Sequence, residues 1–291
     1  MVQSVVETQT PAADGGAISA IYTLPDLPLA ELQNAALPNS IADDRGILLG
    51  GVGSDLWHDA AAPSDELWMV TDRGPNGQVE VDDKNRRTFP VPEFTPHLLQ
   101  VRAEQGLLTV QQALPILTPD GQPVTGLSNL DGFTEQGWDY TAQTKLEFNL
   151  NGIDSEGLVR TADGAFWVAE EYGPSLLHID PAGKVIKRYV PAGLDYSGAS
   201  YPVDAKLPAI YAQRQNNRGF EGLALSPAER TLFAVLQSPL SNPDKEVAER
   251  SRNTRLLAFD LAIEQPVAEY LYRFDDPAAY GEPDAPDEMK L

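Results

Sequence analysis

Acidic residues recur at similar places in three segments of this sequence, where their spacing could support metal or acid–base chemistry. Asp55, Glu156 and Glu221 occupy nearly the same position, at the start of an apolar run in each segment. If the three segments surround one axis, these carboxylates approach one another. Converging carboxylates repel, and a hard cation such as calcium, which prefers oxygen ligands, relieves that repulsion. The sequence therefore predicts a calcium site at these three residues.

A second set of acids follows the next apolar run of each segment. Asp72 and Glu171 each lie four residues beyond a tryptophan, and Glu170 precedes Glu171 directly. Carboxyl groups held close together can have separated pKa values and act as a general acid and a general base. We expect Asp72, Glu156, Glu170 and Glu171 to be the candidate catalytic residues. The alternative is that each acid accepts hydrogen bonds from backbone amides at its own turn, which a repeat reproduces equally well.

Two arginines could bind an anionic group near these acids. Arg73 and Arg218 each precede a glycine at the junction of a loop and a strand. A guanidinium at such a junction presents a fork of donors that suits a phosphate or a carboxylate. Tyr172 stands in the second segment where the first has Arg73, so all three are candidate substrate-binding residues. The alternative is that the arginines neutralise the acids beside them.

Other kinds of catalytic site find little support in the sequence. The chain has no cysteine, which excludes disulfides, thiolate catalysis and cysteine-bound zinc. Its three histidines do not form a HExxH motif, and no GxSxG elbow is present for a serine nucleophile. Carboxylates and arginines are therefore the groups left to carry chemistry.

The net charge of the chain limits the kinds of molecule that it can bind. There are 43 Asp and Glu against 21 Lys and Arg, a formal net charge of −22. Such a surface repels nucleic acids and anionic membranes and attracts cations. If the partner is a small anionic molecule, such as an anionic ester, a bound divalent cation or local arginines must offset the repulsion at the site. No specific protein partner is indicated.

The acids must be positioned by short strands. The stretch 154–190, DSEGLVRTADGAFWVAEEYGPSLLHIDPAGKVIKRYV, contains four apolar runs separated by turn residues. Asp163 and Gly164 predict a two-residue hairpin turn, in which both central positions take a positive φ. The stretch therefore predicts a four-stranded antiparallel meander. A sheet of this kind cannot bury both faces alone and needs similar sheets to stack against.

The sequence contains two more segments of the same design. The predicted blades span 52–115, 154–190 and 219–274, with Trp68, Trp167 and Phe233 at matching places on the second strand. This repeat predicts an all-β fold, a β-propeller of four-stranded antiparallel blades. Three blades do not close a ring, so we expect an incomplete propeller whose C-terminal blades are missing. The alternative is that 277–291 is only an acidic tail.

The remaining segments complete the predicted domain organisation. We expect a disordered segment at 1–16 and one propeller domain at 17–291, in which AISAIYTLP (17–25) is a lone strand that completes a distant blade. The stretches 115–152 and 191–219 are rich in turn residues and predict long loops, with a helical turn at LPAIYAQRQ. No stretch is long and apolar enough to span a membrane, and the first residues lack the features of a signal peptide.

Several strings in these blades resemble a known family. GSDLWHD with ELWMVTDRGPNG, EEYGPSLL, and NRGFEGLALSP are similar to the phytase-like family described as having "esterase-like activity of phytase", over about residue 50 to the end. The resemblance implies a propeller, a bacterial protein located in the periplasm or secreted, and hydrolysis of ester bonds. It also implies that the repeated acids carry the activity, which here are Asp72, Glu156, Glu170, Glu171 and Glu221.

Three functions compete at this point. The first is a metal-assisted hydrolase of phosphate esters or phosphodiesters, with calcium as the favoured cation. The second is a non-catalytic, calcium-stabilised propeller that binds a carbohydrate or a protein. The third is a lactonase-like hydrolase of carboxylic esters, in which one channel metal acts on a neutral substrate.

Overall fold

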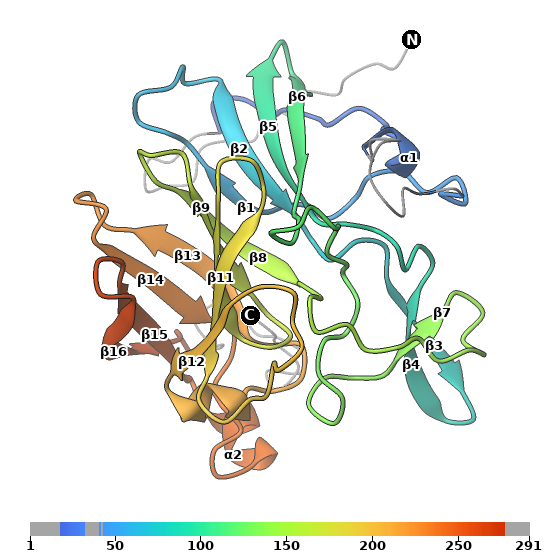
Figure 1. The fold of residues 1–291 in the computed structure, drawn as a ribbon, viewed down its shortest axis with the longest axis vertical. Coiled ribbons are helices and arrows are strands. Elements are labelled where there is room, and N and C mark those ends of the chain that lie inside the picture. Colours follow the sequence, from blue (N-terminus) through green and yellow to red (C-terminus); the bar gives the residue numbers. More distant parts are fainter. Residues whose placement is uncertain (1–17, 33–40, 42, 277–291) are drawn as a thin grey trace.

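The computed structural model describes residues 18–32, 41 and 43–276, and it confirms the predicted all-β fold. Three antiparallel sheets of four strands follow one another along the chain, and the second has an additional strand. Their first strands, β1, β8 and β13, contact one another, so the sheets meet at their inner edges as propeller blades do. Figure 1 shows the first blade at the top, the second in the middle and the third at the lower left.

The strands of the three blades lie close to the predicted ranges. The first blade contains β1 (Val52–Trp57), β2 (Glu66–Thr71), β5 (His97–Glu104) and β6 (Leu107–Pro115). The second contains β8 (Ser155–Arg160), β9 (Phe166–Glu170), β10 (Ser175–Ile179), β11 (Val185–Pro191) and the parallel strand β12 (Val203–Leu207). The third contains β13 (Phe220–Leu225), β14 (Thr231–Leu236), β15 (Asn253–Asp260) and β16 (Gln265–Arg273).

The turn between β8 and β9 is where it was predicted, but its type differs. Thr161 and Ala165 are joined by a backbone hydrogen bond of 2.9 Å, which leaves three residues in the loop. Only Gly164 has a positive φ, of 88°, because the Asp163 carboxylate accepts the Ala165 N–H and the Thr161 hydroxyl and fixes a tighter first turn. The two-residue turn was therefore wrong, and a three-residue loop ending in a left-handed glycine takes its place.

The blades pack face to face through the aromatic residues that mark the repeat. Trp68 of the first blade contacts Phe166 of the second at a ring separation of 4.9 Å. Trp167 of the second blade contacts Phe259 of the third at 5.9 Å. Phe233, at the same place in the third blade, is only half-buried. Each tryptophan therefore fills the interface between its own blade and the next, which fixes how the inner strands converge.

Segments inserted between the strands of the blades form additional short strands and helices. β3 (Gly77–Val81) and β4 (Lys84–Phe89) leave the first blade and form a small sheet with β7 (Gly137–Asp139), at the lower right in Figure 1. The 3₁₀ helix η1 (Ala209–Gln213) confirms the predicted helical turn, whereas β7 and β12 were not predicted within the long loops. Short helices are α1 (Leu29–Leu32) and α2 (Lys245–Arg250).

The N-terminal segment has a different place from the predicted one. Thr23 pairs with Leu107 beside β6, so this segment lies along the outer edge of the first blade and not in a distant one. The segment predicted to be disordered, 1–16, and the stretch 277–291 lie outside the described residues. Among the helices that are described, none has the length and apolar character needed to cross a membrane.

Candidate active site

The first strand of every blade carries a β-bulge, and the bulges decide which acids face the common axis. In β8 the register shifts between Ser155 and Gly157, which leaves Glu156 as the extra residue. In β13 it shifts between Phe220 and Gly222, which leaves Glu221. A bulge re-aims the side chain of its extra residue, so Glu156 and Glu221 are equivalent.

The same register shows that Asp55 is not equivalent to Glu156 and Glu221. In β1 the shift falls between Val52 and Asp55, so Gly53 and Ser54 occupy the bulge. The equivalence expected from the sequence was therefore wrong for Asp55, because the first blade has one more bulge residue than the others. The Asp55 carboxylate instead accepts the N–H of Leu158 at 2.8 Å and that of Leu56 at 2.7 Å. The bond from Leu158 joins β1 to β8. With both oxygens bound to backbone amides, Asp55 is not part of the group of acids described next.

The residue that follows the second strand of each blade (β2, β9 and β14) makes the same backbone contact in all three blades. The backbone N–H of Asp72 donates to Gly51, that of Glu171 to Asp154, and that of Gln237 to Gly219. A side chain at Gly219 would meet the Glu171 carbonyl oxygen at 2.0 Å from its Cβ, so this close approach needs glycine. All three residues thus donate the same backbone hydrogen bond, but their side chains differ: Asp72 and Glu171 are acids, and Gln237 is a neutral amide.

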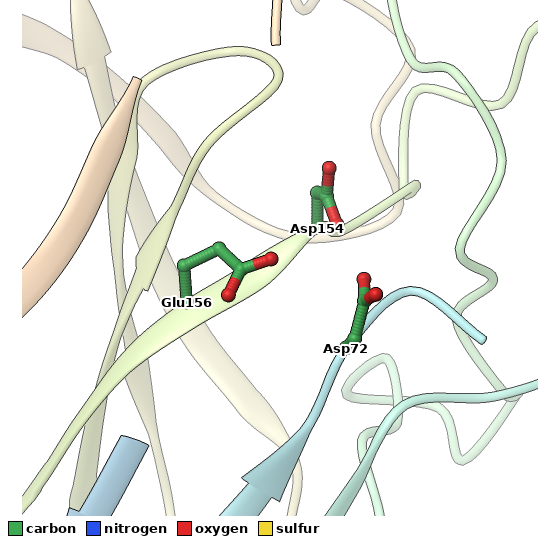
Figure 2. A group of neighbouring side chains, drawn as sticks. All are labelled: Asp72, Asp154 and Glu156. Atoms are coloured by element: carbon green, nitrogen blue, oxygen red, sulfur yellow. The ribbon is translucent and has the colours of Figure 1, made fainter. Parts of the chain in front are cut away.

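Three carboxylates from two blades come together at the axis. Asp72 follows β2, Asp154 directly precedes β8 and Glu156 is the second residue of β8. One oxygen of each lies within 4.8 Å of the others. Figure 2 shows the three side chains directed into a common space. Asp154 was not among the residues selected from the sequence. The alternation of a regular strand could not indicate it, because the bulge at Glu156 interrupts that alternation.

Glu171 and Glu221 extend this group toward the third blade. Each of these two side chains shifts the pKa of the other, so they lie close enough to interact. Glu171 is 3% exposed, and its Oε1 has no hydrogen-bond partner. With the three carboxylates above, the site therefore contains five: Asp72, Asp154, Glu156, Glu171 and Glu221. The second blade supplies three of them, namely Asp154, Glu156 and Glu171.

Burial and mutual repulsion change the acidity of these groups. Burial, followed by the Asp154 charge, raises the pKa of Asp72 to about 7 and that of Glu156 to about 9. The same causes, with the charges of Glu221 and Glu156, raise the pKa of Glu171 to about 10. The pKa of Glu221 is also raised, mainly by burial. Without a cation, Glu156 and Glu171 hold protons at neutral pH.

Arg73 is committed to the acids and to two aromatic rings. Its Nη1 lies 3.3 Å from Asp154 Oδ2, and its Nε donates to the carbonyl of Gly126 at 2.9 Å. The guanidinium lies 3.8 Å from the ring centre of Tyr172 and 4.9 Å from that of Phe89. Both Arg73 and Tyr172 are buried. Arg73 is placed to orient Asp154, the Tyr172 ring packs on the guanidinium, and neither side chain has much surface to offer a substrate.

Arg218 is more open than Arg73. It is partly buried at the start of β13, and its Nη1 donates to Gln237 at 3.3 Å and to the Ser238 hydroxyl at 3.2 Å. Among the described residues, no carboxylate forms an ion pair with it within 4.0 Å, although its charge lowers the pKa of Glu221. Arg218 is therefore the arginine of the site that could meet an anionic ligand.

Glu170 lies beside Glu171 in the chain but belongs to a different environment. Its carboxylate is fully buried and lies 2.8 Å from the Arg188 guanidinium. It also accepts hydrogen bonds from backbone and side-chain donors, at Asn129, Asp154, Tyr172, Gly173 and Ser175. With every lone pair used, Glu170 holds the loop after β9 in place and is not accessible to a substrate.

The chemistry of the donors at the axis fits a hard cation. Two oxygens bound to one calcium ion at 2.3–2.6 Å are separated by at most about 5 Å, which the spacing of the three carboxylates satisfies. Asp154 Oδ1 is buried without a hydrogen-bond partner, as expected for a ligand oxygen. Asp72, Asp154 and Glu156 could therefore hold an ion without rearrangement of the backbone.

The chain is similar in sequence to a secreted fungal protein. An uncharacterized secreted protein of Arthroderma benhamiae is 28% identical over 272 residues, which cover 79% of this chain and 52% of that protein. The chain thus spans about half the length of the curated relative that it matches.

Two solved structures resemble this chain at low sequence identity and low TM-score. The Swd1 β-propeller domain of Myceliophteria thermophila is 13% identical with a TM-score of 0.29, covering 78% of this chain and 61% of that one. A periplasmic gluconolactonase of Pseudomonas aeruginosa is 10% identical with a TM-score of 0.29, covering 74% and 71%. The model of the phytase-like family, "esterase-like activity of phytase", matches residues 47–290. The chain therefore belongs to this phytase-like family.

Proposed function

We propose that the protein is a metal-assisted hydrolase of ester bonds, with phosphate esters and phosphodiesters as the favoured substrates. The observation that carries this proposal is the convergence of Asp72, Asp154 and Glu156 from two blades, with a buried oxygen that lacks a partner. Membership of a family described by esterase-like activity supports the same class of reaction.

The residues at the axis have distinct roles in this proposal. Asp72, Asp154 and Glu156 hold a divalent cation, whereas the set expected from the sequence was Asp55, Glu156 and Glu221. A bound divalent cation, for which calcium is the best fit, would polarise the ester and lower the pKa of a water molecule. Arg73 orients Asp154 through the 3.3 Å ion pair and keeps the ligand oxygens converged.

Glu171 is the candidate group for proton transfer. It interacts electrostatically with Asp154 and Glu156, its Oε1 has no hydrogen-bond partner, and burial followed by the charge of Asp154 raises its pKa to about 10. A carboxyl group that holds its proton at neutral pH can donate it to a leaving alkoxide. Glu170, also a catalytic candidate from the sequence, is assigned a supporting role because its hydrogen bonds are complete.

Arg218 favours an anionic substrate over a neutral one. Its guanidinium is partly exposed next to the acids, and only Nη1 has hydrogen-bond partners among the described residues. A phosphate that bridges the cation and this arginine would be held by two positive charges, which a lactone would not exploit. This is the reason to place the lactonase-like alternative second.

The proposal is tested by hydrolysis assays with chromogenic carboxyl ester, lactone, phosphomonoester and phosphodiester substrates, each with calcium and with chelator. We expect calcium-dependent turnover of a phosphate substrate, and a higher KM for it in Arg218→Gln. Turnover of the neutral esters alone, with no effect of Arg218→Gln, would favour the lactonase-like alternative.

One observation favours a non-catalytic alternative. Asp72 comes from the first blade and Asp154 and Glu156 from the second, so a bound ion would cross-link two blades. An ion of this kind stabilises the folded state by mass action even without catalysis. A calcium-dependent rise in Tm with no turnover of any substrate would support this alternative, in which the loops bind a carbohydrate or a protein.

We also propose that the protein acts outside the cytoplasm, in the periplasm or after secretion. The support is the Arthroderma benhamiae relative, which is described as secreted. Fractionation of cells that express the native gene tests this location.

A further inference from the structure

We infer that the small sheet of β3, β4 and β7 binds a chain of uronic acid sugars on the face that it turns away from the axis. This inference goes beyond the proposed function, because no residue of that face belongs to the five carboxylates. The sheet lies apart from the three blades, at the lower right in Figure 1. The net charge of −22 does not prevent binding there, since charges farther away than about 8 Å are largely screened at physiological ionic strength.

The register of the strands identifies the residues of this face. Val79 of β3 pairs with Arg86 of β4, and Thr88 of β4 pairs with Trp138 of β7. Trp138 pairs in turn with Lys145 in an isolated bridge. Paired residues point to the same side of a sheet, as do residues two apart on a strand. We call this side the basic face, and it carries the following residues: Val79, Val81, Lys84, Arg86, Thr88, Trp138 and Lys145.

The opposite face of the small sheet is turned toward the axis. It carries Glu80 and Arg87, and Arg87 Nε lies 2.7 Å from a carboxylate oxygen of Glu135. Phe89 on the same side is 2% exposed, and the Arg73 guanidinium lies 4.9 Å from its ring centre. Arg73 belongs to the surroundings of the acids at the axis, so the basic face is the side that points outward.

The cations of the basic face are held in place but not neutralised. The Arg86 guanidinium lies 4.1 Å from the ring centre of Trp138, and Lys145 Nζ lies 5.7 Å from it. Arg86 Nη1 also donates to the carbonyl of Ala142 at 2.6 Å. Among the described residues, no carboxylate forms an ion pair within 4.0 Å with Lys84, Arg86 or Lys145. In a chain with 43 acidic and 21 basic residues, these cations leave a local positive potential for an anion.

The shape of the basic face favours an extended polymer over a compact molecule. It is a sheet surface on which Lys84, Lys145 and Val79 are exposed. Residues two apart on one strand are separated by about 6.5–7 Å, and neighbouring strands lie about 4.8 Å apart, so the cations are spread out. Anionic groups that repeat along a chain can contact several of these cations at once, whereas one small anion reaches only part of the face.

Among anionic polymers, the basic face favours sugar acids. An exposed valine among cations suits a sugar ring, which has an apolar C–H face and a carboxylate at its edge. A single-stranded nucleic acid needs free aromatic faces for base stacking, but Arg86 covers the ring of Trp138. An acidic peptide that paired with the edge strand β3 would pass Glu80 and the turn at Asp82 and Asp83, which repel it.

Binding of a short oligogalacturonate to the full chain, measured by isothermal titration calorimetry in chelator, tests the inference. Chelator removes calcium, which would otherwise bridge the sugar carboxylates to the acids at the axis. We expect saturable binding that weakens with salt, and an affinity about tenfold lower for Lys84→Gln/Lys145→Gln. The matched control Lys245→Gln/Arg250→Gln removes the same charge from exposed positions on α2, and its affinity should stay within about twofold of the original.

The outcomes do not depend on the proposed function. Lys84 and Lys145 are exposed, so their double variant should keep the Tm of the original chain and its turnover of any phosphate ester. Absence of oligogalacturonate binding, equal binding of a neutral galactose oligomer, or an equal loss in the control variant would overturn the inference. Tighter binding of oligothymidylate or of oligoglutamate would also overturn it, because the partner would then be a nucleic acid or an acidic peptide.

Discussion

Glu170 and Glu171 are neighbours in the chain and identical in type, yet their surroundings are opposite. Glu170 is fully buried against Arg188 and accepts hydrogen bonds from donors on three sides. Glu171 is almost as buried but has an oxygen with no partner, and its neighbours are other carboxylates. Burial alone therefore does not identify a functional acid in this fold. The supply of donors distinguishes the two.

This difference follows from strand geometry. Successive residues of a strand point to opposite faces, so the end of β9 directs Glu170 toward the loops and Glu171 toward the axis. The loop side offers backbone N–H groups, whereas the axis gathers acids from three blades. Replacement of each glutamate by glutamine should therefore affect stability differently, because only Glu170 faces a buried positive charge that the amide cannot neutralise.

The largest effect is expected from Glu170→Gln. The amide cannot neutralise Arg188 and cannot accept from all its donors, so an uncompensated charge remains buried. We expect the free energy of unfolding to fall by about 3–5 kcal/mol. Urea denaturation of the variant measures this loss. A loss below about 1 kcal/mol would show that the network around Glu170 is not what holds this loop.

Glu171→Gln should instead reduce activity and spare stability. Loss of the proton-transfer group should lower kcat by about 10²–10⁴ on the phosphate substrate that is turned over. Tm in chelator at neutral pH should be nearly unchanged, because Glu171 already holds a proton there and glutamine keeps a neutral side chain of the same shape. A Tm loss similar to that of Glu170→Gln would show that the two acids do not differ in role.

The axis acids should make stability depend on pH. Burial and neighbouring charges raise the pKa of Glu156 from 4.5 to about 9 and that of Glu171 to about 10. Groups with raised pKa values stabilise the folded state below pH 4.5, and this contribution is lost as pH rises through their folded pKa values. In chelator we expect Tm to fall by roughly 5–10 °C between pH 6.5 and pH 9.

Calcium should remove this pH dependence, because its ligands are ionised when it is bound. Measurements above pH 6.5 also avoid the buried His97, whose pKa is lowered by burial to about 4. Calorimetry in buffers of different ionisation enthalpy should show that protons are released on binding at pH 7. A flat Tm profile in chelator, or no proton release, would contradict the protonation of the acids.

Arg73→Lys should weaken calcium binding without unfolding the protein. Lysine keeps the charge beside Asp154 but loses the planar contact with Tyr172 and the Gly126 hydrogen bond. We expect a Kd about tenfold higher, as for other residues that support metal ligands. Arg102→Lys, at a surface pair with Glu66, is the control and should bind calcium normally. Equal affinities of the two variants would remove Arg73 from the site.

The smallest effect is expected from Asp55→Asn. One of its two backbone hydrogen bonds, to Leu158 or Leu56, must be weakened when an oxygen becomes an amide. We expect a loss of about 1 kcal/mol in the free energy of unfolding, and a calcium affinity within about twofold of the original. A large change in calcium affinity would return Asp55 to the group of ligands.

The sequence predicted the blades well because their information is local. Alternating apolar residues, turn residues and the matching Trp68, Trp167 and Phe233 place all three blades near their observed ranges. The loop strands β7 and β12 were not predicted, since their pairing partners are distant in sequence and each strand is short. The turn at Asp163 and Gly164 was located correctly but assigned the wrong type, because side-chain bonds to the backbone select among turns.

The site was only partly predictable, and the bulges explain why. The sequence by itself determined that acids recur at the inner ends of the blades, and it selected Asp72, Glu156, Glu171 and Glu221. It could not show that β1 has an extra bulge residue that turns Asp55 away, or that Asp154 turns inward. A shift of one residue changes the face of a strand, and only the pairing with neighbouring strands sets that shift. Tertiary structure thus decided which acids have donors and which face one another.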